Sequence, residues 1–461
     1  MEATNKSQSP YEINFAKTFI FILYGLASLL GWNAIMSELP FFTFYLQRMD
    51  PATSFQFLNF SLNIVLQFLM LYNRNLVPLK FRLIAGLIAG IIIMIILPII
   101  VLFMEKNSLA NELVTGAIIL IMGMVNALCS GGFFALVSFF PIKLMIAFSA
   151  GQGFSGVMMN IIQYIVLGCV NSGDEQKDLD KTSWIYFGIS AGFLVVILFI
   201  LLYQLRTEFF AFYLQPLNKK KKNDEIKNEE NIKEDEKNVK LVSVEKNNEN
   251  QNNMNTDDAE QNTNNNNIND NRITIENDNS PKPQKGKEIS FFEMFKILMD
   301  LDLLRTYINF ISNALFPKAG ITQSLFKFGK YKVVTILIIY NFMDFFGRYI
   351  VLAMKQTKLK TYIIALGRTI LVFLLIFNYY CEVDLKVDLN ITSSLLIIYV
   401  VALGLTHGMG NSLCFGLAPT MVKDELKLQA GSSMSFFTVF GLFLGSCAGF
   451  LTSFILKKIE E

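Results

Sequence analysis

Two oppositely charged residues lie four positions apart within a strongly apolar stretch of this 461-residue chain. Asp344 and Arg348 belong to the segment 341–348, which reads NFMDFFGR. On an α-helix, the spacing of Asn341, Asp344 and Arg348 places three polar side chains on one face. We expect that face to point into a protein interior, because a charge at the centre of a bilayer costs at least ~2.5–3.5 kcal/mol.

The pair allows two interpretations. In the first, Asp344 accepts hydrogen bonds from a neutral polar solute and Arg348 donates them. In the second, the two form an internal ion pair that locks their helix to its neighbours. The residue types favour neither. Arg368, in another apolar stretch, is better explained as a residue that bonds carbonyl or polar groups near the cytoplasmic end of its helix.

An aromatic face occurs near the start of the chain. Leu29, Trp32 and Met36 share one side of a helix. A tryptophan deep in an apolar helix, away from a membrane interface, is a candidate platform on which a planar ring stacks. Plain packing explains the same pattern equally well.

Isolated polar residues occur in other apolar stretches. Asn126 and Ser130 lie one turn apart and could line a polar cavity, although small polar residues more commonly hold helices together. His407 and Asn411 have the same spacing. A lone histidine in such a helix is more often a hydrogen-bonded structural residue than a proton relay.

Composition excludes several functional classes. Hydrophobic residues make up 52% of the chain and charged residues 17%, with a net charge of +2, so there is no basic bias toward a nucleic acid polymer. The single histidine rules out a multi-histidine metal site, and no phosphate-binding GxxxxGK[ST] motif occurs. We expect neither a metal nor a cofactor. The absence of a GxSxG motif, of paired histidines and of a carboxylate cluster in the apolar stretches also disfavours a membrane-embedded enzyme.

Eleven stretches are long and apolar enough to cross a bilayer, which needs roughly 20 residues. We therefore predict an all-α integral membrane fold of eleven helices, six before a central gap and five after it. The predicted spans are 15–46, 55–76, 83–104, 113–139, 144–170, 183–206, 295–320, 331–354, 362–380, 393–418 and 430–456.

The gap separates two halves. Residues 207–288 contain a lysine run and an unbroken asparagine tract at Asn264–Asn267. Such a composition cannot bury enough apolar surface to offset the entropy of ordering, so we predict a disordered linker. The predicted domains are thus 1–206, the linker 207–288, and 289–461. A receptor or scaffold acting through the linker is disfavoured.

Lysine and arginine gather in loops on one side of the predicted spans, which makes that side cytoplasmic. These residues are Arg74, Lys80, Arg82, Lys143, Lys219–Lys222, Lys355, Lys358, Lys360, Lys423 and Lys427. Lys327, Lys330 and Lys332 are the exception. We therefore predict that the N-terminus and the linker are cytoplasmic and that the C-terminus is outside. The sequon Asn390-Ile391-Thr392 falls on the outer side, in agreement with this topology.

Several motifs, in their order along the chain, resemble those of the equilibrative nucleoside transporter family. The segment 341–348 fits the family's Asn-x-x-Asp-[Trp/Phe]-x-Gly-Arg signature. The other matching motifs are Gly31-Trp32-Asn33, Pro141 with Ala150–Gly153, Phe316-Pro317, Gly367-Arg368, Ala430-Gly431 and Phe436-Phe437. The similarity extends over nearly the whole chain outside the linker.

The resemblance implies a bundle similar to that of the major facilitator transporters, with one helix fewer. It also implies the transport of nucleosides, and in some members nucleobases, down their gradients by alternating access. By this resemblance Leu29, Trp32 and Met36 contact the base, and Asp344 and Arg348 hold the ribose hydroxyls. The other implied cavity positions are Ser130, Phe316, Asn341 and Leu442.

Ser130 departs from the family pattern, because many members carry a base-reading glutamine there. A hydroxyl cannot span the same distance, so the family's base preference does not transfer to this chain.

We therefore expect a monomeric plasma-membrane protein, in contact with the lipid bilayer, that carries nucleosides or nucleobases without covalent chemistry. The alternative is a proton-coupled transporter of the same fold, in which Asp344, Glu38 or His407 would titrate during the cycle.

Overall fold

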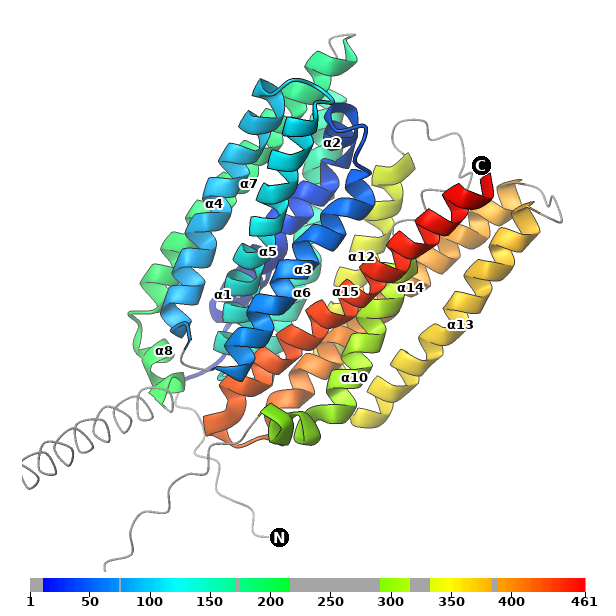
Figure 1. The fold of residues 1–461 in the computed structure, drawn as a ribbon. Coiled ribbons are helices and arrows are strands. Elements are labelled where there is room, and N and C mark those ends of the chain that lie inside the picture. Colours follow the sequence, from blue (N-terminus) through cyan, green and yellow to red (C-terminus); the bar gives the residue numbers. More distant parts are fainter. Residues whose placement is uncertain are drawn as a thin grey trace, which may run out of the picture. The chain divides into compact units, whose positions relative to one another are not determined.

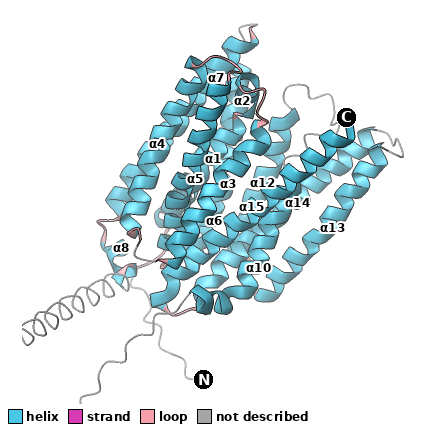
Figure 2. Ribbon diagram, in the orientation of Figure 1, coloured by secondary structure: helices cyan, strands magenta, loops and turns pink. Residues whose placement is uncertain are grey.

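The computed structural model describes residues 11–73, 76–170, 174–215, 291–315, 332–383 and 389–460. Each long element within these ranges is a helix (Figures 1 and 2). The N-terminal helices are α1 (Phe15–Ser37), α2 (Leu39–Tyr45), α3 (Pro51–Tyr72), α4 (Leu79–Phe103), α5 (Leu109–Val137), α6 (Ile142–Cys169), α7 (Glu175–Gln204) and α8 (Glu208–Tyr213). The C-terminal helices are α10 (Phe291–Leu315), α12 (Lys332–Ala353), α13 (Lys358–Val383), α14 (Leu389–Leu417) and α15 (Lys427–Glu460), with short 3₁₀ turns at Ala418–Met421 and Asp424–Leu426.

Nine of the described helices are long and apolar enough to cross a membrane. The helices α10 and α13 are not among these nine, so the predicted count of eleven, in a six-plus-five arrangement, stays a prediction. Helices on both sides of the central gap belong to one compact unit, which spans Met1–Tyr213 and Ser290–Glu461. The predicted linker, 207–288, begins one residue before α8 and contains this short helix, and its residues 216–288 lie outside the described part of the chain.

Polar and proline residues set where several helices begin. Asn14 and Ser108 accept hydrogen bonds from the backbone amides of Lys17 and Asn111, which satisfies donors that the first turns of α1 and α5 leave unpaired. Proline occupies the first position of α3, where it replaces an amide that has no helical partner. The long apolar runs between these signals continue as helices.

Glycines allow two pairs of helices to approach until their backbones touch. A Cβ atom on Gly25 of α1 would lie 1.9 Å from the carbonyl oxygen of Phe148 on α6, and one on Gly151 of α6 would lie 2.0 Å from that of Ile22. On α14, a Cβ atom on Gly408 would lie 2.0 Å from the carbonyl oxygen of Asp344. The backbones of α12 and α14 therefore meet at the predicted site.

The N-terminal and the C-terminal helices approach each other closely where the end of α5 packs against the start of α15. A Cβ atom on Gly431 would lie 2.4 Å from the carbonyl oxygen of Phe134. A short apolar cluster of Leu71, Phe436 and Phe437 joins α3 to α15. This end of the bundle carries α8 and the start of α10, and it lies at the bottom of Figure 1.

Substitution of Gly408 by alanine should destabilise the fold, because the new methyl group forces α14 away from α12. Overpacking of this kind typically costs about 1–3 kcal/mol. Thermal unfolding of the detergent-solubilised protein measures the effect. Gly192→Ala on α7 is the matched control, since nothing lies within 4 Å of its Cβ position, and it should leave the melting temperature unchanged or slightly raised. Equal melting temperatures for both variants would contradict the close approach at Gly408.

Candidate functional site

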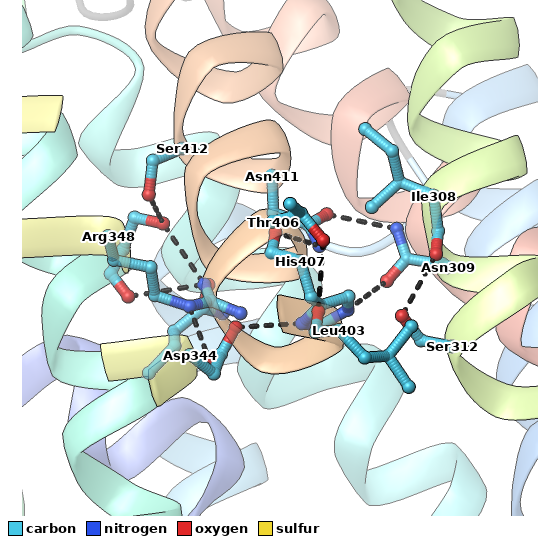
Figure 3. A network of polar contacts seen from close by, with 12 residues as sticks. Ile308, Asn309, Ser312, Asp344, Arg348, Leu403, Thr406, His407, Asn411 and Ser412 are labelled. Atoms are coloured by element: carbon cyan, nitrogen blue, oxygen red, sulfur yellow. Dashed lines mark hydrogen bonds and ion pairs between the residues drawn. The ribbon is translucent and has the colours of Figure 1, made fainter. Parts of the chain in front are cut away.

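Asp344 and Arg348 form an ion pair, which is one of the two interpretations that their spacing allows. Arg348 Nε donates to Asp344 Oδ2 at 2.9 Å, and both residues are 5% exposed. The pair lies on the side of α12 that faces α6 and α14 (Figure 3). The expectation that this face points into the protein is confirmed.

Arg348 extends the pair across the interface to α6. Its Nη1 donates to the hydroxyl of Ser149 at 3.0 Å, to the Ser149 carbonyl at 3.2 Å and to Gln152 Oε1 at 3.3 Å. The Ser149 hydroxyl lies 2.8 Å from that of Ser412 on α14. The guanidinium therefore connects α12 to α6, and the Ser149 hydroxyl continues the contact to α14.

The second oxygen of Asp344 meets the only histidine of the chain. His407 Nδ1 lies 2.7 Å from Asp344 Oδ1, and His407 Nε2 lies 3.3 Å from Oδ1 of Asn309 on α10. Asn309 in turn donates to Oδ1 of Asn411 at 2.9 Å. The network thus continues through α14 to α10, as Figure 3 shows.

Arg368 on α13 forms a separate, enclosed centre. Its Nη1 donates to the Leu403 carbonyl at 3.0 Å and to the Thr406 hydroxyl at 2.7 Å, and its Nη2 donates to the Ser312 hydroxyl. The residue is 0% exposed. The expectation that Arg368 bonds carbonyl and polar groups is confirmed, and these bonds hold α13 to α14 and α10.

The aromatic face on α1 is partly open. Leu29, Trp32 and Met36 are each half-buried, and the Trp32 ring packs against Phe60 of α3 with its centroid 5.5 Å away. Part of the indole surface therefore remains accessible. The adjacent Asn33 donates to the Ser155 hydroxyl of α6 at 3.0 Å.

The remaining predicted positions are distributed over several helices. Asn341 is half-buried and lies against Gly156 of α6, where a Cβ atom would come within 2.7 Å of Asn341 Cγ. Ser130 is buried on α5, and Leu442 is half-buried on α15, with its carbonyl accepting from Asn313 at 2.6 Å. Phe316 lies outside the described residues.

Asn126 holds two helices together rather than standing free. Its Nδ2 donates to Asn59 Oδ1 on α3 at 2.8 Å, and both residues are buried. This contact is the commoner of the two uses considered for small polar residues in membrane helices.

Sequence reasoning missed several members of the network. Arg305 is fully buried on α10, where Nη1 donates to the Asn411 carbonyl at 2.8 Å and the guanidinium lies 5.2 Å from the Phe134 ring centroid. A charge within a predicted span was a signal that could have found it. Asn309 and Ser149 gave no comparable signal, because single polar residues are frequent in such helices. Among the described residues, no cluster of histidine, cysteine or carboxylate side chains could hold a metal ion.

Comparison with known proteins identifies both a family and a fold. The family model described as Nucleoside transporter matches residues 116–454, which is more than half of the chain. No curated protein matches the chain in sequence.

Among solved structures, the proton:xylose symporter XylE of the major facilitator superfamily is 14% identical, with a TM-score of 0.59 over 96% of this chain and 95% of that chain. The E. coli fucose:proton symporter FucP is 11% identical, with a TM-score of 0.52 and coverage of 97% and 93%. The human organic anion transporter MFSD10 is 12% identical, with a TM-score of 0.52 and coverage of 95% and 93%. At these identities the similarity establishes the major facilitator fold alone.

The contact between Asn59 and Asn126 should be measurable in a double-mutant cycle. We expect Asn59→Ala and Asn126→Ala to destabilise the protein non-additively, with a coupling energy near the average of about 0.6 kcal/mol found for hydrogen bonds between membrane helices. Denaturant unfolding of the wild type, both single variants and the double variant measures the coupling. Strictly additive losses would show that the two amides do not bond.

Proposed function

Because this chain belongs to the nucleoside transporter family, we propose that it carries nucleosides across a membrane by facilitated, alternating-access transport. The family and the major facilitator fold make the protein a multi-pass membrane transporter and not an enzyme. The proposal extends to nucleobases as additional substrates.

The observation that carries this proposal is the Asp344–Arg348 pair at the interface between N-terminal and C-terminal helices. A ribose presents neighbouring hydroxyl groups, which both donate and accept hydrogen bonds. A carboxylate beside a guanidinium supplies an acceptor and a donor for two such neighbouring hydroxyl groups. Hydrogen bonds to charged groups are roughly twice as strong as bonds between neutral groups.

Arg348 retains a donor for such a ligand. Its Nε and Nη1 make the bonds to Asp344, Ser149 and Gln152. Within the part of the chain that the structure describes, Arg348 Nη2 donates to no partner. A sugar hydroxyl could accept from Nη2 without displacing the existing bonds.

The position of the pair suits alternating access. Arg348 bonds to α6 as well as to its own helix, so a ligand bound there would contact both groups of helices that must move relative to each other. The partly open Trp32 ring supports a role as the base platform, with Leu29 and Met36 beside it. Ser130, Asn341, Leu442 and Phe316 complete the proposed cavity.

We further propose that the protein acts as a monomer in the plasma membrane. The N-terminus and the linker would be cytoplasmic and the C-terminus outside, as the distribution of lysine and arginine predicts. Flux would follow the substrate gradient, since the sequence contains no phosphate-binding motif for ATP.

Proton-coupled transport is the second candidate. The observation that supports it is the contact of 2.7 Å between Asp344 Oδ1 and His407 Nδ1, since both side chains can gain and lose a proton. Glu38 is another buried carboxylate, whose Oε2 accepts from the Ser183 hydroxyl at 3.0 Å. Uptake into proteoliposomes with and without an imposed pH gradient separates the two mechanisms. Accumulation above the external concentration, driven by the pH gradient alone, would establish proton coupling.

Asp344→Asn should weaken nucleoside binding roughly 5- to 10-fold, because one bond to a charged group becomes neutral and loses about half of its strength. Binding of free nucleobases, which have no sugar hydroxyls, should fall less. Both affinities are measured on folded, purified protein, so that a general loss of folding does not count.

Asp302→Asn is the matched control for this prediction. Asp302 on α10 is 0% exposed and accepts from the Ser433 hydroxyl on α15, and it makes no hydrogen bond to Asp344, Arg348 or His407 among the described contacts. Its replacement should alter stability without changing the ratio of nucleoside to nucleobase affinity. An equal loss of both affinities in Asp344→Asn, together with poor folding, would leave Asp344 as a structural bridge.

Trp32→Ala should weaken nucleoside affinity by about 1–3 kcal/mol, the usual range for base–aromatic stacking. The chain has one other tryptophan, Trp184 on α7, which is exposed and serves as the control. Titration calorimetry on both variants measures the difference. Unchanged affinity in Trp32→Ala would mean that the ring only packs against Phe60.

A further inference from the structure

His407 lies between two oxygen atoms from two other helices. Its Nδ1 faces Asp344 Oδ1 on α12 at 2.7 Å, and its Nε2 faces Asn309 Oδ1 on α10 at 3.3 Å (Figure 3). The side chain is 12% exposed. The ring is therefore enclosed with both of its nitrogens engaged.

The hydrogen bonds of Asn309 determine which end of its amide faces the ring. Its Nδ2 donates to the Arg305 carbonyl at 2.7 Å and to Asn411 Oδ1 at 2.9 Å. Asn411 is oriented in the same way, because its own Nδ2 donates to the His407 carbonyl at 3.2 Å. A backbone carbonyl can only accept. Rotating either amide would place two acceptors against each other, so Asn309 must present its oxygen to His407.

A neutral imidazole has one donor nitrogen and one acceptor nitrogen, whereas an imidazolium has two donors. Both partners of His407 are acceptors, since Asp344 is held as a carboxylate by the Arg348 Nε atom 2.9 Å from its other oxygen. Either neutral tautomer would leave one ring lone pair facing an oxygen.

We propose that His407 is a positioning residue for the sugar-binding pair, an imidazolium that fixes the Asp344 carboxylate by bridging it to Asn309. The positioning role rests on the proposed function, because it assumes that Asp344 binds the substrate. His407 anchors one carboxylate oxygen and Arg348 the other, so the plane of the carboxylate is set before a ligand arrives. The same ring ties α12, α14 and α10 together.

Charged groups around the ring both favour and oppose the imidazolium, so that it can lose one of its two ring protons. Asp344 on α12 stabilises the imidazolium, whereas Arg348 on the same helix, Arg305 on α10 and Arg368 on α13 oppose it. Tyr340 on α12 lies with its ring centroid 5.9 Å from that of His407. The Ser149 and Gln152 side chains through which α6 joins the network carry no charge.

Proton loss therefore has a defined structural result. The tautomer that keeps the hydrogen on Nδ1 retains Asp344 and releases Asn309, and the other tautomer does the reverse. In either case the ring no longer joins Asp344 to Asn309 once the pH has risen, and the carboxylate is no longer held against α10. Nucleoside affinity should then fall at high pH and be restored when the pH is lowered.

The single histidine makes the test direct, because ¹⁵N-histidine labelling reports on His407 alone. The full chain, purified through an affinity tag without histidine and placed in nanodiscs, is examined by NMR across a pH series without ligand. We expect both ring nitrogens to be protonated at the pH at which the protein binds uridine or adenosine. A ring with one bare nitrogen at that pH would overturn the proposal.

Nucleoside affinity is measured on the same samples. We expect the wild-type affinity to fall roughly tenfold across the pH range in which the ring loses its proton, the effect of losing about one charged hydrogen bond. The His407→Gln variant should bind nucleoside weakly, with an affinity that does not depend on pH. Its affinity should equal that of the wild type only at high pH. A constant difference between the two at every pH would refute the positioning role.

Asn309→Leu provides a second variant that keeps the histidine. Removing the acceptor at Nε2 should shift the ring titration to lower pH, whereas Asn313→Ala, one turn further along α10 and bonded to α15, should leave it unchanged. An unshifted titration in Asn309→Leu would show that Asn309 does not stabilise the proton.

The experiment separates this proposal from the proposed function. The charge of the ring is read without any ligand. A protein that binds no nucleoside or nucleobase at any pH would refute the transport proposal while still giving the protonation state of His407. Nucleoside binding with a neutral ring would refute the positioning role and leave the transport proposal standing.

Discussion

The free-energy cost of burying charge governs the architecture of the C-terminal helices. Five charged side chains of the described C-terminal helices are at least 95% buried in a bundle that a bilayer surrounds: Asp302, Arg305, Asp344, Arg348 and Arg368. Unpaired, each would be unfavourable by several kcal/mol. Each arginine therefore draws carbonyl, hydroxyl or amide groups from neighbouring helices, and those bonds determine which helices lie together.

The three arginines differ in what they connect. Among the described residues, Arg368 bonds only to groups on α10 and α14, and so it holds C-terminal helices to one another. Arg305 bonds to α14 and α15, and its guanidinium also lies over the Phe134 ring of α5. Arg348 alone makes hydrogen bonds to α6 among these described contacts. A ligand that engages Arg348 would therefore contact the interface between N-terminal and C-terminal helices.

Close backbone approach makes these bonds possible. Gly408 on α14 and Gly153 on α6 both face α12 around the ion pair, and a Cβ atom on Gly153 would lie 2.8 Å from the Phe345 Cα atom. Short polar side chains such as serine reach a partner only at such separations. The same small residues that pack the bundle, as expected for membrane helices, thus bring the network within hydrogen-bonding distance.

The sequence by itself determined the features that depend on local periodicity. The spacing of Asn341, Asp344 and Arg348 places them on a common face, because a helix repeats every 3.6 residues, but it left the ion pair as one of two interpretations. Apolar length gave the membrane helices, and the charge of Arg368 in an apolar run required enclosure among polar groups. The tertiary structure decided which distant groups complete the site. Helix packing brings His407 to Asp344, which lies 63 positions earlier in the chain. It also brings Ser149 to Arg348, which lies 199 positions later. No local pattern encodes it, since each of those residues is an ordinary single polar residue in an apolar helix.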